Sequence, residues 1–147
     1  RQEILIALKQ KYGRKIRIFG NIWGKDFDDL CQSAKIIFQP KWLNNDFLWG
    51  QQIYQVLGAG GFLIHPRLYG LQEEGFDEGT HYVGYSIYEE LLAGLDFFLK
   101  PENTEKRKLV AEQGRKFVLI NCTWENRIET IFKIIKEKLL IKLKNEN

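Results

Sequence analysis

The chain has 147 residues, 44% of them hydrophobic and 14% aromatic, which is enough to bury the core of one ordinary domain but not of two large ones. Its formal net charge of +3 is too small and too mixed in sign to indicate a nucleic-acid-binding protein. No apolar run approaches the roughly 18 residues that a membrane-spanning helix requires.

The chain contains two cysteines and no methionine. Cys31 and Cys122 lie far apart and lack the paired spacing of a zinc site, so we expect reduced thiols and a cytoplasmic location. Translation begins with Met, and a Met that precedes Arg is not normally removed. We therefore expect residues 1–147 to be a single domain that belongs to a longer protein.

The first forty residues alternate between helical and extended patterns. Apolar residues at helical spacing predict a helix over 4–12, and the alternating segment 15–19 predicts a strand that ends at Gly20. Acidic residues at its start and apolar residues on one side predict a helix over 26–34. A short buried strand is expected at 36–38.

The middle of the chain continues this alternation. Helical spacing predicts a helix over 47–57, and a strand at 62–64 follows the glycine-rich segment 58–61. Another strand is expected at 81–85, before a capping box at 86–89 that opens a helix. The residues of this helix expected to face inward are Ile87, Leu91, Leu95, Phe98 and Leu99.

Two further helices are expected, over 104–119 and 123–143. Strands that alternate with helices throughout predict an α/β domain with a parallel sheet. In such domains ligands bind at the carboxyl ends of the strands, so the functional residues should gather there.

The glycines of segment 58–61 suggest a phosphate loop, but their place in the chain argues against one. A phosphate loop runs from strand to glycines to helix, whereas Gly58, Gly60 and Gly61 follow a helix and precede a strand. We predict a left-handed helix cap and close packing of helix on strand. The segment 20–25 has the correct order, and it is either a simple turn or a loop that lines a phosphate or sugar site through Gly20.

Three stretches together resemble a known family. They are "SAKIIFQP" from Ser33, "GQQIYQVLGAGGFLIHPRLYGLQEEGFDEGTHYVGY" from Gly50, and "KRKLVAEQGRKFVLINCTWENRIETI" from Lys106. Their order resembles the C-terminal donor-binding domain of GT-B-fold glycosyltransferases of group 1, in the branch that is similar to spore-maturation proteins.

The resemblance implies a Rossmann-like three-layer domain that forms half of an enzyme. It would bind a nucleotide-diphosphate sugar, and a second Rossmann-like domain would supply the acceptor site and any catalytic base. No cofactor or metal is expected, because the pair Asp28 and Asp29 lies inside a predicted helix and not at a strand end.

The resemblance also nominates donor-binding residues. Gln52 and Gln55 occupy the positions at which the family carries an Arg and a Glu that bonds the donor. His65 and Arg67 follow a strand, near the expected diphosphate or sugar, and Gly70 belongs to a turn whose backbone amides can meet phosphate. The alternatives are an exposed helix residue for Gln55, a structural histidine for His65 and a solvated turn residue for Arg67.

Three residues after the 36–38 strand could contact the nucleotide base. They are Gln39, Lys41 and Trp42, of which Trp42 would stack on the base, although a packing role for this tryptophan is equally plausible. Lys41 and Arg67 would stabilise the departing diphosphate.

The last predicted helix is basic and amphipathic over 123–144. Its stretch 133–144 carries five lysines and one glutamate among isoleucines and leucines, which suits an anionic membrane surface. Packing against this domain or a missing one is the alternative, and Arg127 is expected to fix the helix to the domain. Two other functions also remain open: a non-catalytic carbohydrate-binding or protein-binding module, and part of a sugar-nucleotide epimerase.

Overall fold

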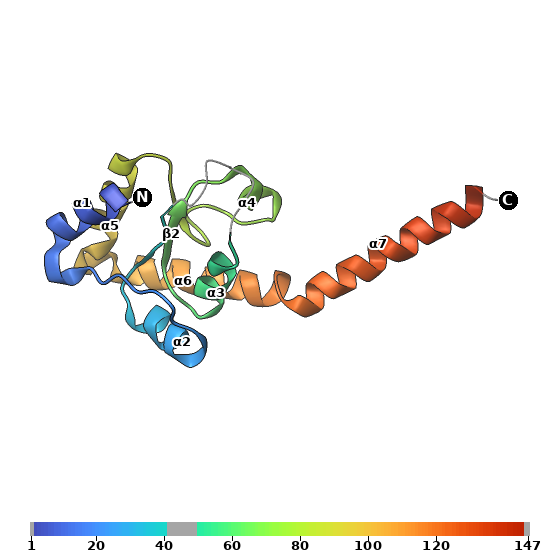
Figure 1. The fold of residues 1–147 in the computed structure, drawn as a ribbon, viewed down its shortest axis with the longest axis horizontal. Helices are drawn as coiled ribbons and strands as arrows, with labels where there is room; N and C mark the ends of the chain where they lie inside the picture. Colours follow the sequence, from blue (N-terminus) through green and yellow to red (C-terminus); the bar gives the residue numbers. More distant parts are fainter. Residues whose placement is uncertain (1, 41–49, 146–147) are drawn as a thin grey trace.

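The computed structural model describes residues 2–40 and 50–145 of the chain (Figure 1). Three short strands, β1 (Ile37–Phe38), β2 (Leu63–Pro66) and β3 (Val83–Tyr85), form a parallel sheet in the order β1-β2-β3. The parallel sheet that the sequence predicts is therefore confirmed.

The described part of the chain also contains seven helices and two 3-10 turns, and all the helices except α7 lie around this sheet (Figure 1). In chain order they are α1 (Gln2–Tyr12), η1 (Gly13–Lys15), α2 (Gly24–Ser33), α3 (Gln52–Gly58), α4 (Tyr69–Glu73), α5 (Tyr88–Leu99), η2 (Pro101–Asn103), α6 (Thr104–Asn121) and α7 (Trp124–Asn145). The helix expected over 47–57 begins at Gln52, its sixth residue, with Gln51 as the N-cap residue, and 47–49 lie outside the described residues.

The central strand β2 is buried on both faces, as strands of a parallel sheet are. Ile64 packs in one cluster with Leu8 of α1 and Leu91 of α5. Leu63 points to the opposite face, where it packs in a second cluster with Leu57 of α3. Helices on both faces of the sheet give the three-layer α/β architecture that the sequence predicts.

Helix α6 packs closely on the rest of the domain at Gly114. A Cβ atom on this glycine would lie 2.5 Å from the backbone oxygen of His81 and 3.0 Å from Cδ2 of Leu57. Because backbone cannot move aside as easily as the end of a side chain, only glycine permits this approach.

The glycine-rich segment after α3 forms the cap that the sequence predicts. Gly60 has a φ of +86°, in the left-handed region, and its N–H donates to the oxygen of Leu57 at 2.9 Å. A Cβ on Gly61 would lie 3.0 Å from Cγ1 of Val56. The glycines therefore end a helix and let it pack on the next strand.

The strand predicted at 15–19 is absent from the sheet, so that prediction was wrong. η1 covers the start of this segment, Ile16 packs against the core, and Ile18 and Phe19 are 57% and 49% exposed. β1, an edge strand of the sheet, contains only two residues, so the edge that it offers is too short for a further ladder. Alternation of apolar residues predicts a strand only where a partner strand is available.

The prediction of a capping box at 86–89 was wrong by one residue. α5 begins at Tyr88, and the backbone N–H of Ser86 donates to Oε2 of Glu90 at 2.8 Å, so the carboxylate comes from one residue further on. Ile87 was expected to face inward but is 55% exposed, because it is the N-cap residue. The inward residues that are buried as predicted are Leu91, Leu95 and Phe98.

Helix α7 is fixed to the domain at its first turn. The side chain of Asn126 accepts from the backbone N–H of Thr123 at 3.1 Å, and the hydroxyl of Thr123 accepts from the N–H of Asn126 at 3.3 Å. Arg127 pairs with Glu74 at 3.4 Å and lies 5.1 Å from the centre of the Tyr54 ring. The prediction that Arg127 holds the last helix is confirmed.

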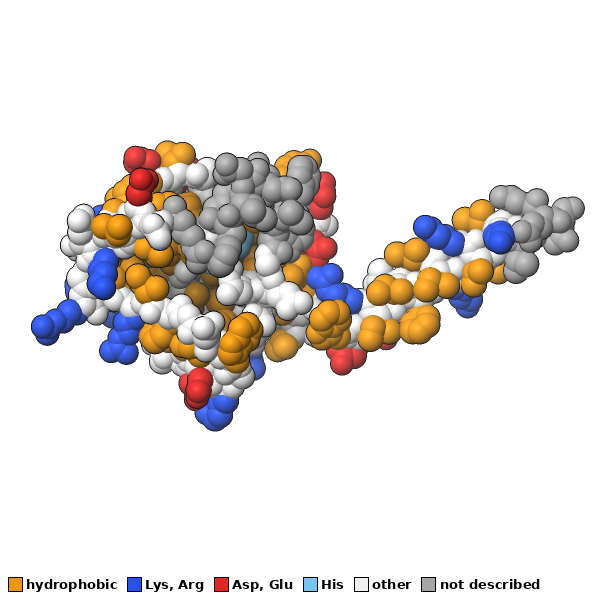
Figure 2. Space-filling model, in the orientation of Figure 1, with side chains coloured by type: hydrophobic (Ala, Val, Ile, Leu, Met, Phe, Trp, Pro, Cys, Tyr) orange, Lys and Arg blue, Asp and Glu red, His pale blue; other side chains and the backbone are white. Residues whose placement is uncertain are grey.

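Beyond Arg127, α7 leaves the domain and runs away from it (Figure 1). Every residue in 128–142 is exposed, including all its isoleucines and leucines. Figure 2 shows hydrophobic side chains along this helix, with lysines beside them. Packing of 128–142 against this domain, one of the expected alternatives, is therefore excluded.

Candidate functional site

The carboxyl ends of the three strands meet at one edge of the sheet. Gln39 follows β1, Arg67 follows β2 and Ser86 follows β3. The hydroxyl of Tyr85 donates to the backbone oxygen of Gln39 at 3.2 Å, and the backbone N–H of Arg67 donates to the oxygen of Tyr85 at 2.7 Å. Two of the residues predicted to bind a ligand, Gln39 and Arg67, are thus held at the same edge.

Gln39 and Gln52 form a direct pair. Gln39 is 9% exposed, and its Nε2 donates to Oε1 of Gln52 at the start of α3. The other side-chain atom of Gln39, Oε1, is buried and accepts no hydrogen bond from any residue that the structure describes. Buried polar atoms are nearly always paired, so this oxygen is an exception among the described residues.

Arg67 has most of its hydrogen-bonding groups engaged. Its Nε and Nη2 donate to the two carboxylate oxygens of Glu78, both at 2.7 Å, and its Nη1 donates to Glu90 at 2.9 Å and to the hydroxyl of Ser86 at 2.8 Å. Hydrogen bonds to these carboxylates raise the pKa of Arg67. The pKa of Glu90 is lowered, first by the hydrogen bond from the backbone N–H of Ser86 and then by the bond from the guanidinium of Arg67. The charge of Arg67 is matched by two carboxylates, while its side chain remains 38% exposed.

A glycine makes room for this network. A Cβ on Gly84 of β3 would lie 2.6 Å from Oε2 of Glu78, so the carboxylate rests against the bare Cα. Gly84 also accepts from Nη2 of Arg67 at 3.5 Å. A side chain at position 84 would therefore displace the Glu78 carboxylate from its present place beside Arg67.

His65 is buried one residue before the end of β2. Its Nδ1 lies 2.8 Å from the oxygen of Pro66, and since a carbonyl only accepts, Nδ1 carries the ring hydrogen. Burial lowers the pKa of His65 to about 4, so the ring is neutral at pH 7. In this geometry the only N–H of the ring is engaged, and any contact with a ligand would use Nε2 as an acceptor.

The other predicted site residues are less closely associated. Gln55 is exposed on α3, Gly70 is buried in α4, and Gly20 is exposed in the loop before α2 with open space around its Cα. Lys41 and Trp42 lie outside the described residues.

Glu78 and Glu90, the partners of Arg67, are not among the residues predicted from the sequence. Glu78 lies in the loop before β3, and Glu90 lies in the first turn of α5. An acidic residue in the first turn of a helix is favoured by the helix dipole, so the sequence offers no reason to expect that Glu90 also pairs with Arg67. The only signal was an arginine at a strand end near several acidic residues, and a single sequence does not give such long-range pairings.

Neither a metal cluster nor a membrane span is found in the part of the chain that the structure describes. No three His, Cys, Asp or Glu side chains in residues 2–40 and 50–145 gather in a way that could hold a metal ion. Within those ranges, none of the helices combines the length and the apolar character that crossing a bilayer demands. Both cysteines, Cys31 and Cys122, are free thiols, as expected.

Comparison with known proteins gives one match. The model of a family described as glycosyl transferase-like matches residues 1–133, which is most of the chain. No curated protein and no solved structure matches significantly. The matched region contains the whole sheet and every residue of the edge described above.

Proposed function

Because the chain belongs to the glycosyl transferase-like family, we propose that it binds the nucleotide-diphosphate sugar donor of a glycosyl transfer reaction. The binding site in this proposal is the carboxyl edge of the sheet. The observation that carries it is the gathering of Gln39, Gln52 and Arg67 at that edge, where parallel α/β sheets bind their ligands.

The glutamine pair would recognise hydroxyl or amide groups of the donor. With Nε2 of Gln39 bound to Gln52, the unpaired oxygen of Gln39 is an acceptor, and the amide nitrogen of Gln52 is a donor. Sugars and bases offer both kinds of partner. These bonds would be between neutral groups, and each would be roughly half as strong as one to a carboxylate.

Arg67 would bind the diphosphate by exchanging one partner. Glu78 holds it through two bonds and is 30% exposed, whereas Glu90 holds it through one bond and is 44% exposed. We therefore expect a phosphate oxygen to replace Glu90 at Nη1 while Glu78 keeps the guanidinium in place. Lys41 would supply a second positive charge to the departing diphosphate.

The proposal assigns the acceptor site and the catalytic base to a second Rossmann-like domain facing this edge. Among the described residues of the edge, the carboxylates of Glu78 and Glu90 are engaged by Arg67 and His65 is buried. This chain would therefore contribute donor binding and stabilisation of the leaving group.

A second candidate function is a non-catalytic module that binds carbohydrate or protein. It is favoured by the two amides, Gln52 and Gln55, and by the compensation of the Arg67 charge, all of which reduce the affinity for a diphosphate. The two functions differ in whether the nucleotide part is required for binding.

Isothermal titration calorimetry with UDP-, GDP-, ADP- and CDP-sugars at millimolar concentration tests the proposal. We expect one nucleotide class to bind, and the free sugar to bind at least about tenfold more weakly, because charge-assisted bonds to the diphosphate would be lost. No binding by any nucleotide would contradict the proposal, and equal binding of the free sugar would favour the non-catalytic module.

Variants locate the site. Arg67→Ala and Gln52→Ala should each weaken donor binding by about tenfold or more, since each removes a group from the edge. The matched control is Arg14→Ala, at an exposed arginine of η1, which should leave the affinity within about twofold. Thermal unfolding of each variant separates loss of binding from loss of fold, and equal weakening by Arg14→Ala would refute the location.

A further inference from the structure

Helix α7 carries an apolar stripe that nothing in the described domain covers. The stripe consists of residues three or four positions apart, which places them on one face of the helix: Trp124, Ile128, Ile131, Phe132, Ile135 and Leu139. Each is between 47% and 70% exposed. At 1.5 Å per residue the stripe is about 23 Å long.

The direction of α7 is fixed although its stripe is uncovered. The capping pair Thr123 and Asn126 starts the helix, and Arg127 joins it to Glu74 and to the ring of Tyr54. The stripe therefore lies on a helix whose first turn is fixed to the domain by hydrogen bonds and an ion pair. Such a large exposed apolar surface marks an interaction site.

The charge of the helix restricts its partner. Residues 133–144 contain five lysines against one glutamate, whereas 124–132 contain Arg127 against Glu125 and Glu129, so the distal part of the helix favours a negative partner surface. Parallel pairing with the α7 helix of a second copy would bring five lysines against five lysines, and this repulsion opposes such a pair.

We propose that α7 docks on the surface of a membrane that contains anionic lipid. The apolar stripe enters the boundary between headgroups and acyl chains, and the lysines bind lipid phosphates. This inference goes beyond donor binding and does not depend on it.

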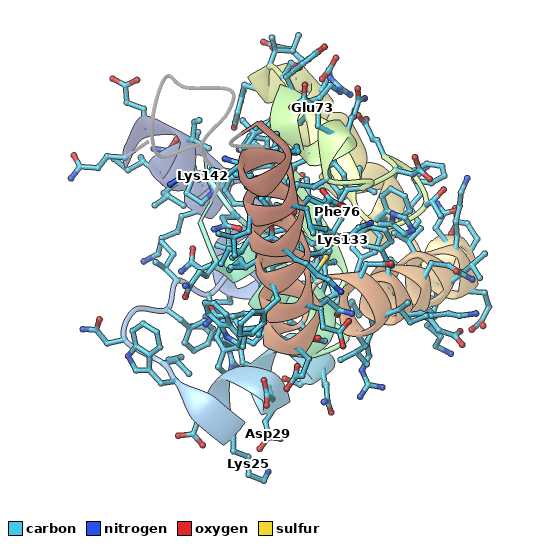
Figure 3. All side chains as sticks on the ribbon, turned by 90° about the vertical axis from the view of Figure 1, so that its right-hand side faces the viewer. Lys25, Asp29, Glu73, Phe76, Lys133 and Lys142 are labelled. Atoms are coloured by element: carbon cyan, nitrogen blue, oxygen red, sulfur yellow. The ribbon has the colours of Figure 1, made fainter. Side chains whose placement is uncertain are left out.

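The positions of the lysines favour a lipid surface over an acidic groove in a protein. By helical spacing, Lys138 and Lys136 flank the stripe on its two sides, and Lys142 follows in line with it. In Figure 3, Lys133 and Lys142 leave α7 on different sides. Lysines on several sides suit a fluid surface, because their long stems extend along the apolar boundary while the ammonium groups reach phosphates.

Trp124 supports the same orientation. It stands at the end of the stripe nearest the domain and is 70% exposed. Tryptophan is enriched at the level of lipid headgroups, where its ring is partly in apolar surroundings and its N–H can bond. The domain would thus rest beside the membrane with α7 lying in its plane.

Co-sedimentation of the whole chain with vesicles tests the proposal. We expect binding to vesicles of phosphatidylcholine with about one third phosphatidylglycerol, at least about tenfold weaker binding to pure phosphatidylcholine, and weakening by salt. Absence of binding to the anionic vesicles, or equal binding to both kinds, would overturn it.

A matched pair of double variants identifies the face. Ile135→Ser with Leu139→Ser changes two stripe residues, whereas Ile134→Ser with Leu140→Ser changes the same residue types off the stripe. The first should weaken binding by more than about tenfold and the second by about twofold or less. All four residues are 46% to 56% exposed, so both variants should fold, which circular dichroism can check. Equal losses in the two variants, or a dimer in place of vesicle binding, would overturn the proposal.

Discussion

The domain body, residues 2–40 and 50–123, and helix α7 use the same kinds of residue in opposite ways. In the body, Leu8, Leu63 and Leu91 are fully buried around a parallel sheet. In α7, Leu139 and Leu140 are more than half exposed, on a helix that leaves the body (Figure 1). Helical periodicity therefore specifies that a helix has an apolar face, while residues outside the helix decide what covers that face.

The largest expected effect comes from truncating one leucine in each region. Leu91→Ala should lower the free energy of unfolding by about 2–5 kcal/mol, because it removes a fully buried side chain and leaves a cavity. Leu139→Ala should change it by less than about 0.5 kcal/mol, because the side chain is already in contact with water. Urea unfolding of both variants measures the difference. Similar losses would mean that the α7 leucine is buried in solution.

Acid should destabilise the body through His65. The pKa of His65 is about 4 in the folded state, below its ordinary value of 6.5, so the unfolded chain binds the extra proton first as the pH falls. Stability is therefore fully present above pH 6.5 and should fall by about 3 kcal/mol as the pH approaches 4. Both histidines of the chain lie in the body, and burial lowers the pKa of His81 in the same direction.

The variant His65→Asn sharpens this prediction. Its amide can donate to the oxygen of Pro66 but cannot ionise, so the unfolding free energy should depend less steeply on pH between 6.5 and 4. Urea unfolding at several pH values gives both slopes. If the two proteins show the same slope, the buried neutral histidine is not the cause.

A pair of helix glycines tests the close packing of the body. Gly114→Ala places a Cβ 2.5 Å from the backbone oxygen of His81 and should cost about 1–3 kcal/mol. Gly94→Ala, in α5, meets its nearest atom at 3.7 Å, so it should be neutral or stabilise by up to about 1 kcal/mol through helix propensity. Thermal unfolding should show a lower midpoint temperature for Gly114→Ala and an unchanged or higher one for Gly94→Ala. A stabilised Gly114→Ala would show that α6 does not approach the body this closely.

The smallest expected effect lies at the junction of the two regions. Thr123→Ala removes the cap of α7 and should cost about 1 kcal/mol, confined to the first turn of that helix. Amide hydrogen exchange of α7 measures it better than global unfolding. Thr130→Ala, inside the same helix, is the control and should not speed exchange, because its hydroxyl only bonds back to the oxygen of Asn126.

The sequence predicts the architecture well because its patterns are local. Helical spacing, the glycine cap at Gly60 and the buried run of β2 each identify an element from its own residues. The strand expected at 15–19 fails for the opposite reason, since a strand needs a partner that its own residues do not specify.

The site is predicted less well, because its properties come from pairings. Gln39 and Gln52 are nominated separately, and their mutual bond follows from the fold alone. Arg67 is nominated as a phosphate ligand, yet Glu78 and Glu90, which set its charge balance, are distant in the sequence and escape notice. Whether these residues bind a donor stays a prediction.

The bare Cα of Gly84 has a consequence for how the family can vary. The carboxylate of Glu78 occupies the space that a methyl group at position 84 would fill, and Glu78 in turn holds Arg67. A side chain at position 84 would displace this carboxylate, whereas Arg67 would keep its bonds to Ser86 and Glu90. Across related sequences we therefore expect positions 78 and 84 to change together, so that members with a side chain at 84 lack the acidic residue at 78.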